Sequence, residues 1–234
     1  MITIYKKEFR QYFRSMIGYI YLSIFLLISG FYFVTGNLFS QSGDIKKFFS
    51  SFSTILVFLI PLITMRTFSE EKKMKTHQLL FTMPILESSI VFGKFFATLS
   101  LFLIGMTFTL LYPLILSYYG SFELFVFVGN YLGITLLIST FISIGIFIST
   151  LTENQIIAAV VSYSIILGLW LIDSVSLFIV KGSLKTLLEY ISIKNGFREF
   201  TLGIFNPANI VYYLSLIAFF LFSSIFVLQN RKTI

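Results

Sequence analysis

The chain has 234 residues, of which 57% are hydrophobic and 12% charged, about half the charged fraction of an ordinary soluble domain. This composition excludes a soluble globular domain and indicates an integral membrane protein. Cysteine is absent, which excludes a disulfide framework, a thiol nucleophile and a cysteine-ligated metal. The net charge of +7 is spread over several loops, so we expect it to favour anionic lipid and not nucleic acid.

The first predicted element is an amphipathic helix over residues 1–15. Its apolar residues recur at helical spacing as Tyr5, Phe9, Tyr12, Phe13 and Met16, and its polar residues as Lys6, Lys7, Arg10, Gln11 and Arg14. We predict that this helix lies in the membrane interface; the alternative is a simple extension of the first span into the cytoplasm. It is not a cleavable signal, because the uncharged run that follows has 29 residues, about twice a signal's apolar core.

Six uncharged runs are long enough to cross a bilayer as helices, for which about 18 residues suffice. They predict membrane helices at 17–38, 48–68, 90–116, 124–151, 155–180 and 209–229. Barrel strands would alternate every second residue, so the predicted fold is an all-α bundle of six transmembrane helices. The chain 1–234 then forms a single transmembrane domain, with local kinks expected at Pro61 and Pro113.

Basic residues in the loops predict the orientation. Eleven of the 17 Lys and Arg residues lie on the side that carries both termini, and six lie on the other side. Because basic loops stay in the cytoplasm, both termini are expected there.

The segment 69–88 is the most polar connection in the chain, yet it contains an apolar helix. Thr76 is a plausible N-cap, and the helix it begins must stop before Pro84. The side chains that this helix presents outside the membrane are Leu79, Leu80, Phe81 and Met83. An exposed apolar face needs a partner; the alternative is that these side chains rest on the chain's own span ends.

The connection 181–208 on the opposite side is too apolar for a free loop. Its first helical face consists of Leu184, Leu187, Leu188 and Ile191, and its second of Phe197, Phe200, Thr201, Ile204 and Phe205. We predict two short helices that dip into the outer interface, separated by a break at Asn195-Gly196.

Motifs for catalysis are absent from the sequence. The only Gly-Lys pair, Gly93-Lys94, is followed by Phe95, so there is no P-loop and any nucleotide energy must come from another subunit. His77 is the single histidine, so we expect neither a metal site nor a catalytic triad. The chain is therefore not expected to be an enzyme.

Two features inside the predicted spans allow more than one interpretation. Asp173 is a carboxylate within the fifth span, which makes it a candidate for a pathway or gate; the alternative is that it lines the outer third of the span beside water. Gly129 and Gly133 form a G-x-x-x-G motif, which favours close helix packing either within the chain or between two copies.

The stretch MRTFSEEKKMKTHQLLFTMPI, followed by VFGKFFA at 91–97, resembles the loop between the second and third membrane helices of ABC-2 type transporter permeases. The residues that match the pattern of that family are Glu70, Glu71, Lys72, Thr76, Leu79, Leu80, Thr82, Pro84, Gly93, Lys94 and Ala97. Gln78 and Lys75 stand where the family often has Glu and Gly. Both ends of the chain, KKEFRQYFRSMIGYIYLSIFLLISGFYF and FREFTLGIFNPANIVYYLSLIAFFLF, resemble compact six-helix permeases of gliding-motility-type ABC transporters.

The resemblance implies a permease half that pairs with a second permease, identical or related, in a bacterial cytoplasmic membrane. It implies a separate cytoplasmic ATPase subunit that binds ATP and Mg, with residues 76–84 as the coupling helix. The implied coupling interface is Arg66, Glu70, Glu71, Thr76, Gln78, Leu79, Leu80, Phe81, Thr82 and Pro84. Phe197, Phe200 and Phe205 would form an external gate or docking surface.

Export is the direction that the resemblance implies, and a Phe-, Ser-, Tyr- and Ile-rich pathway would suit an amphipathic or lipidic cargo. A second interpretation is a non-transporting scaffold or mechanotransducer that acts on an extracytoplasmic partner, such as a gliding-type accessory protein. An ion-coupled secondary transporter would need buried charges at mid-membrane and broken helices in both halves, and Asp173 alone does not supply them.

Overall fold

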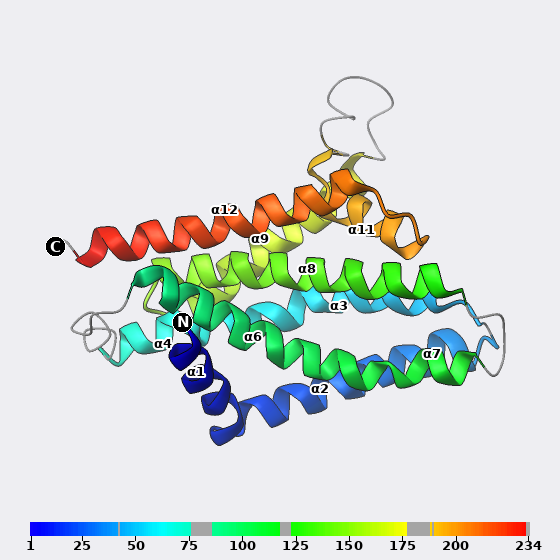
Figure 1. Ribbon diagram of the computed structural model, residues 1–234, viewed down its shortest axis with the longest axis horizontal. Helices are drawn as coiled ribbons and strands as arrows, with labels where there is room; N and C mark the ends of the chain where they lie inside the picture. Colours follow the sequence, from blue (N-terminus) through cyan, green and yellow to red (C-terminus); the bar gives the residue numbers. More distant parts are fainter. Residues whose placement is uncertain (42, 76–85, 118–122, 177–187, 189, 233–234) are drawn as a thin grey trace.

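The computed structural model describes residues 1–41, 43–75, 86–117, 123–176, 188 and 190–232 (Figure 1). Every element assigned within these ranges is a helix. Six stretches of the described chain are long and apolar enough to cross a membrane, and the predicted all-α bundle with six transmembrane helices is confirmed.

The helices follow one another in a simple order along the chain. They are α1 (Ile2–Arg14), α2 (Ile17–Phe33), the π-helical turn η1 (Val34–Leu38), α3 (Ile45–Thr64), α4 (Arg66–Lys73), α6 (Glu87–Thr109), α7 (Leu111–Leu116), α8 (Leu124–Leu151), α9 (Gln155–Ser176), α11 (Ile193–Thr201) and α12 (Pro207–Lys232). Three spans are thus built from two helical pieces in sequence, namely α2 with η1, α3 with α4, and α6 with α7.

The two prolines have different local effects. Helix α3 runs through Pro61 and ends at Thr64, whereas α6 ends at Thr109, four residues before Pro113. Proline has no N–H to donate to the carbonyl four residues earlier, so the hydrogen-bond ladder is interrupted at Thr109. The helix resumes at once as α7, and the break is local.

Helix α8 forms the centre of the bundle. Its span is 78% buried, against 22% for α9 and for α12, and it contacts α3, α6, α9, α11 and α12 (Figure 1). A helix that is apolar on every side is suited to this position. Most of its serines and threonines bond within the helix, as Ser139 does to the Thr135 carbonyl at 2.7 Å, so these hydroxyls do not oppose burial.

Glycines let other helices approach α8 closely. A Cβ on Gly129 would lie 2.6 Å from the Phe200 carbonyl oxygen, and one on Gly133 would lie 2.6 Å from the Phe200 Cβ. The G-x-x-x-G pair of the sequence therefore holds α11 of the same chain. On the same helix, Gly145 faces Thr64 of α3.

Helix α11 corrects one detail of the sequence analysis, because it runs without interruption through Asn195 and Gly196. Its first turn is capped by the Ser192 side chain, which accepts a hydrogen bond from the Asn195 N–H at 3.2 Å, and Gly196 lies beside the Tyr213 ring. These tertiary and capping contacts outweigh the turn preference of Asn-Gly. Most of the predicted first helix of this connection, 184–191, lies outside the described residues.

Helix α1 is separated from α2 by a sharp turn. Met16 adopts a left-handed conformation, with φ of 57°, so the chain changes direction between Arg14 and Ile17. Figure 1 shows α1 at a steep angle to α2, at the end of the bundle that also carries α4 and both termini. This end is called the α1/α4 end below. The location of α1 in the membrane interface stays a prediction.

The close packing of α11 on α8 predicts that a methyl group added at Gly129 destabilises the fold. We expect Gly129→Ala to lower the free energy of unfolding by about 1–3 kcal/mol, since its Cβ meets backbone that cannot rotate away. The matched control is Gly168→Ala in α9, where nothing lies within 4 Å of the added Cβ. Thermal unfolding of both variants in the same detergent measures the difference, and equal melting temperatures would contradict this packing.

Candidate functional site

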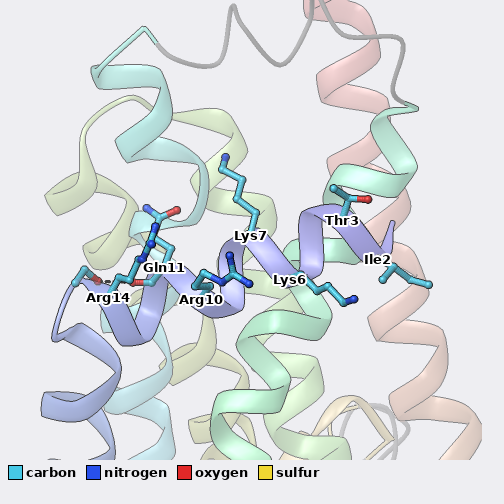
Figure 2. A pocket seen from close by; sticks show the side chains of 8 residues that line it. Ile2, Thr3, Lys6, Lys7, Arg10, Gln11 and Arg14 are labelled. Carbon is cyan, nitrogen blue, oxygen red and sulfur yellow. Dashed lines mark hydrogen bonds between the residues drawn. The ribbon is translucent and has the colours of Figure 1, made fainter.

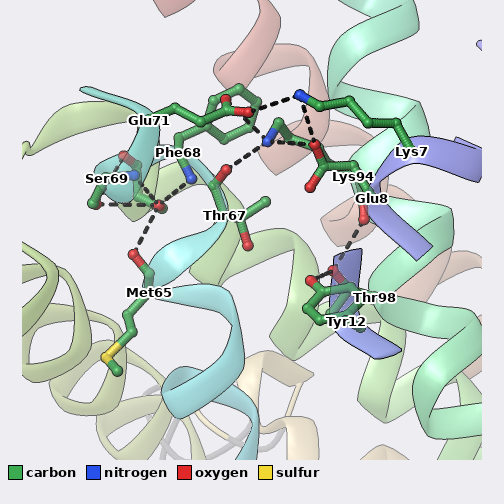
Figure 3. A network of polar contacts seen from close by, with 11 residues as sticks. Lys7, Glu8, Tyr12, Met65, Thr67, Phe68, Ser69, Glu71, Lys94 and Thr98 are labelled. Atoms are coloured by element: carbon green, nitrogen blue, oxygen red, sulfur yellow. Dashed lines mark hydrogen bonds and ion pairs between the residues drawn. The ribbon is translucent and has the colours of Figure 1, made fainter. Parts of the chain in front are cut away.

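The α1/α4 end brings together four elements that are far apart in the sequence. Helix α4 lies between α1, the first turns of α6 and the last turn of α8, and Figure 3 shows the polar contacts that join them. The segment 69–88 leaves the membrane region through α4 and returns through α6. Whatever binds that segment therefore acts first on this end.

A buried lysine lies at the centre of these contacts. The Lys94 Nζ is 3.2 Å from a Glu8 carboxylate oxygen and 3.0 Å from one of Glu71. It also donates to the Thr67 carbonyl at 2.7 Å and lies over the Phe68 ring, 4.9 Å from its centroid. The Lys94 side chain is 1% exposed. These residues, with Lys7, are called the Lys94 cluster below.

Lys7 closes the cluster on its outer side. Its Nζ lies 3.5 Å from a Glu71 oxygen and 3.7 Å from a Glu8 oxygen, and about half of its side chain is exposed. Two lysines thus face two carboxylates. Since an ion pair loses hydration when buried, it must be geometrically complete to be tolerated, and this alternation of charge completes it.

The start of α4 is held by a hydroxyl from α8. The Ser149 Oγ accepts hydrogen bonds from the N–H groups of Phe68 and Ser69, at 2.9 and 3.0 Å, and donates to the Met65 carbonyl at 3.2 Å. The first N–H groups of a helix have no partner within it. Ser149 uses both acceptor positions and its one proton, and so caps α4 from another helix.

The end of α4 is also attached to α8. The Lys72 ammonium donates to the carbonyl of Thr150, in the last turn of α8, where unpaired carbonyls carry partial negative charge. Lys72 is buried. Helix α4 is therefore fixed at its first turn, at Glu71 and at its last turn.

Helix α1 is attached mainly to α6. The Tyr12 hydroxyl lies 2.9 Å from the Thr98 Oγ1, and the Tyr5 hydroxyl lies 3.1 Å from the Ser100 Oγ. Burial raises the pKa of Tyr12 above its ordinary value, which keeps the hydroxyl protonated. Gly93 allows the approach, since a Cβ there would lie 2.9 Å from Ile4.

Three residues of the predicted coupling interface fall at this end. Arg66 makes a two-bond pair with Glu70, at 2.8 and 3.1 Å, on the partly exposed side of α4. Such an i,i+4 pair contributes about 0.5 kcal/mol. Glu71 faces inward and belongs to the Lys94 cluster. The other predicted interface residues, Thr76, Gln78, Leu79, Leu80, Phe81, Thr82 and Pro84, lie outside the described residues.

The other predicted site residues lie at the opposite end. Asp173 in α9 forms an ion pair with Lys194 of α11 at 3.2 Å, so it ties the two helices together. Phe197 and Phe200 are buried, at 3% and 0% exposure, whereas Phe205 is 37% exposed. In this conformation Phe205 alone of the three presents an accessible ring for docking.

Sequence reasoning missed the central role of Lys94, Glu8 and Ser149. Lys94 was counted among the basic residues on the water side and matched as part of a family motif. A signal was present: Lys94 stands between Phe92 and Phe95 on an apolar segment, and a charge buried there requires an opposite charge. Its partners could not be identified, because they are 86 and 23 positions away.

The carboxylates at this end are paired with basic side chains. Within the described residues, no group of three or more His, Asp or Glu side chains could hold a metal ion, Glu8 and Glu71 are engaged by lysines, and Glu70 is engaged by Arg66. The arrangement attaches α4 to α1, α6 and α8.

Removal of the Lys94 charge tests how tightly this end is held. We expect Lys94→Met to lower the free energy of unfolding by about 3–5 kcal/mol, because Glu8 and Glu71 then lose their buried counter-ion and keep only the half-exposed Lys7. Glu8→Gln in the same background should recover part of the loss. The matched control is Lys73→Met, at an exposed position of α4. Thermal unfolding in detergent distinguishes them, and equal destabilisation would refute the role of Lys94.

The comparison with protein families agrees with the fold. The family described as ABC-2 family transporter protein matches residues 2–232, nearly the whole chain. Among curated proteins, no relative matches. The chain therefore belongs to the ABC-2 transporter family, whose members are multi-pass membrane components of ABC transporters that work with a partner ATPase subunit.

Proposed function

We propose that this chain is one permease half of an ABC exporter in which segment 69–87 receives the movement of a cytoplasmic ATPase subunit. ATP and Mg bind to that subunit, and its closure pushes on the helix 76–84. Both termini then lie in the cytoplasm, as the distribution of basic residues predicts, in a bacterial inner membrane.

The observation that carries this proposal is the anchoring of α4. This eight-residue helix directly precedes the predicted coupling helix, and it is held by Ser149, by Lys94 and by the Thr150 carbonyl. A push at its end cannot be absorbed by α4 alone. It must move α1, α6 and α8 as well, which is what transmission to a transport pathway requires.

Transmission also has an energetic condition. The ATPase can bias the permease only if its contact with segment 69–87 differs in free energy between the two states of the ATPase. An apolar pair such as Leu79 and Leu80 meets this condition when it is buried in one state and less buried in the other. Arg66 and Glu70 would then stiffen the exposed side of α4 next to the contact.

The outer helices supply the surface for a second permease copy, identical or related. Most of the apolar side chains of α2, α9 and α12 are exposed or partly exposed in the single chain, and these side chains must face lipid or a partner helix. A pathway lined by such residues suits an amphipathic or lipidic cargo, which moves outward.

The alternative function is a mechanotransducer that delivers the same movement to an extracytoplasmic partner and transports nothing. The observation that favours it is the apolar rim around α11. Tyr190 is 77% exposed, Leu202 50% and Ile204 53%, at the end of the molecule opposite α4. A gliding-type accessory protein is the kind of partner proposed there.

The coupling helix is tested by a double substitution. We expect Leu79→Asp with Leu80→Asp to abolish copurification of the ATPase subunit and stimulated ATP hydrolysis, because two carboxylates cannot enter an apolar groove unpaired. Leu79→Met with Leu80→Met keeps the volume and should retain both. Pull-down from mild detergent and ATPase assays measure the two properties. Full stimulation of the ATPase by the Asp variant would refute the proposal.

The role of α4 in transmission is tested separately from ATPase binding. Ser149→Ala leaves the N–H groups of Phe68 and Ser69 without their acceptor, a loss of about 1–3 kcal/mol. We expect the ATPase subunit to copurify normally, with stimulated hydrolysis reduced severalfold. The matched control is Ser143→Ala, another buried serine of α8 that bonds only within its helix, to Thr140 at 2.7 Å. Equal hydrolysis with the two variants would contradict transmission through α4.

A further inference from the structure

One face of α1 is a hollow lined by cations. Lys6, Lys7, Arg10 and Arg14 line it, with Thr3 and Gln11 between them, and all come from α1 (Figure 2). Their spacing of three and four residues places them along one side of the helix. All four basic residues are exposed, and Lys7 also forms ion pairs with Glu8 and Glu71.

Within the part of the chain that the structure describes, only Lys7 of the four basic residues has carboxylate partners, namely Glu8 and Glu71. No carboxylate is among the described residues that line the hollow. Glu8, the only acid of α1, is turned to the opposite face, where it pairs with Lys94 at 3.2 Å. Lys6, Arg10 and Arg14 therefore have no carboxylate partner in the described chain, and they lie beside two polar side chains that can donate hydrogen bonds.

A row of aromatic rings indicates where this face lies relative to a membrane. The rings of Tyr5, Phe9, Phe13 and Tyr19 follow one another in contact, with centroids 5.8, 5.1 and 5.4 Å apart. The first membrane helix begins at Ile17, and Tyr19 is 58% exposed on it. Aromatic side chains of this kind collect at the level of lipid headgroups, so the cations of α1 reach the same level.

We propose that this cationic face binds the phosphate groups of anionic phospholipids in the leaflet at the α1/α4 end. Guanidinium groups offer two parallel donors to a phosphate, and Arg10 and Arg14 are one helical turn apart. Thr3 and Gln11 can donate to remaining oxygens. A lipid fits better than an acidic protein surface, because the aromatic row joins the face to the apolar exterior of the bundle.

The bound headgroup acts on the Lys94 cluster through Lys7. Lys7 lines the hollow and also lies 3.5 Å from a Glu71 oxygen. A phosphate in the hollow competes with Glu71 for this ammonium. Anionic lipid therefore weakens the ion pair between Lys7 and Glu71 on the outer side of the Lys94 cluster. The charge of the bilayer thus influences how firmly α4 is held.

The test compares the full chain in nanodiscs of phosphatidylcholine with and without phosphatidylglycerol. Thermal unfolding of the chain is monitored by the fluorescence of its single tryptophan, Trp170. Phosphatidylglycerol should raise the melting temperature of the native chain. Lys6→Gln with Arg10→Gln should lose most of this rise, since each cation near an anionic surface contributes about fivefold in affinity. Lys7 is left unchanged, so the Lys94 cluster stays complete. High salt should reduce the rise.

Two controls keep the result interpretable. Lys46→Gln with Lys47→Gln removes the same charge from the start of α3, at the other end of the bundle, and should keep the rise. Lys6→Arg with Arg10→Lys should also keep it. Equal loss from the α3 variant, or no rise in the native chain, overturns the proposal. A rise caused by soluble glycerol phosphate in phosphatidylcholine discs overturns it too, in favour of a free-anion site. None of these measurements needs the ATPase subunit.

Discussion

The burial of the Lys94 ammonium is the constraint on which the α1/α4 end depends. A charge that is 1% exposed is tolerated only when opposite charges and carbonyls surround it, and here they come from two other helices, α1 and α4. Glu8 can reach Lys94 only if α1 lies across α6, and Glu71 can reach it only if α4 continues beyond Met65. One requirement for neutralisation thus fixes the positions of α1 and α4 together, and hence the point where segment 69–88 leaves the bundle.

Helix α8 extends this constraint to the opposite end. Its last turn holds α4 through Ser149 and Thr150, whereas its first half holds α11 through Gly129 and Gly133. Asn130 adds a hydrogen bond to the Thr201 carbonyl at 3.3 Å. Because α8 is buried along its length and close-packed, the two ends of the molecule are joined by a single rigid helix. A displacement of α4 has a direct physical route to the apolar rim around α11.

The sequence predicted the spans far better than the site, for a physical reason. Span length and the lack of charge are properties of consecutive residues, so the six apolar runs could be read directly. The Lys94 cluster depends on contacts between residues 23 and 86 positions apart, which no local pattern specifies. The predicted break at Asn195-Gly196 was wrong for the same reason: the dipeptide favours a turn, but the Ser192 cap and the Tyr213 ring keep it helical. Arg66, Glu70 and Glu71 were assigned to the coupling interface by the family resemblance and not by their spacing, and that role stays a prediction.

The two proposed functions make the same demand on one end of the molecule and different demands on the other. A permease and a mechanotransducer both need an α4 that cannot move alone, so the Lys94 cluster does not separate them. If Phe197 and Phe200 form the proposed external gate, the difference lies where α11 packs on α8. There, Phe197 and Phe200 fill the glycine groove and Asp173 is paired with Lys194, so opening a pathway through this packing would require both contacts to break. Moving a partner protein requires neither, since Tyr190, Leu202 and Ile204 are already exposed. The state of the Phe200 packing during ATP hydrolysis is therefore the structural feature that distinguishes transport from mechanical work.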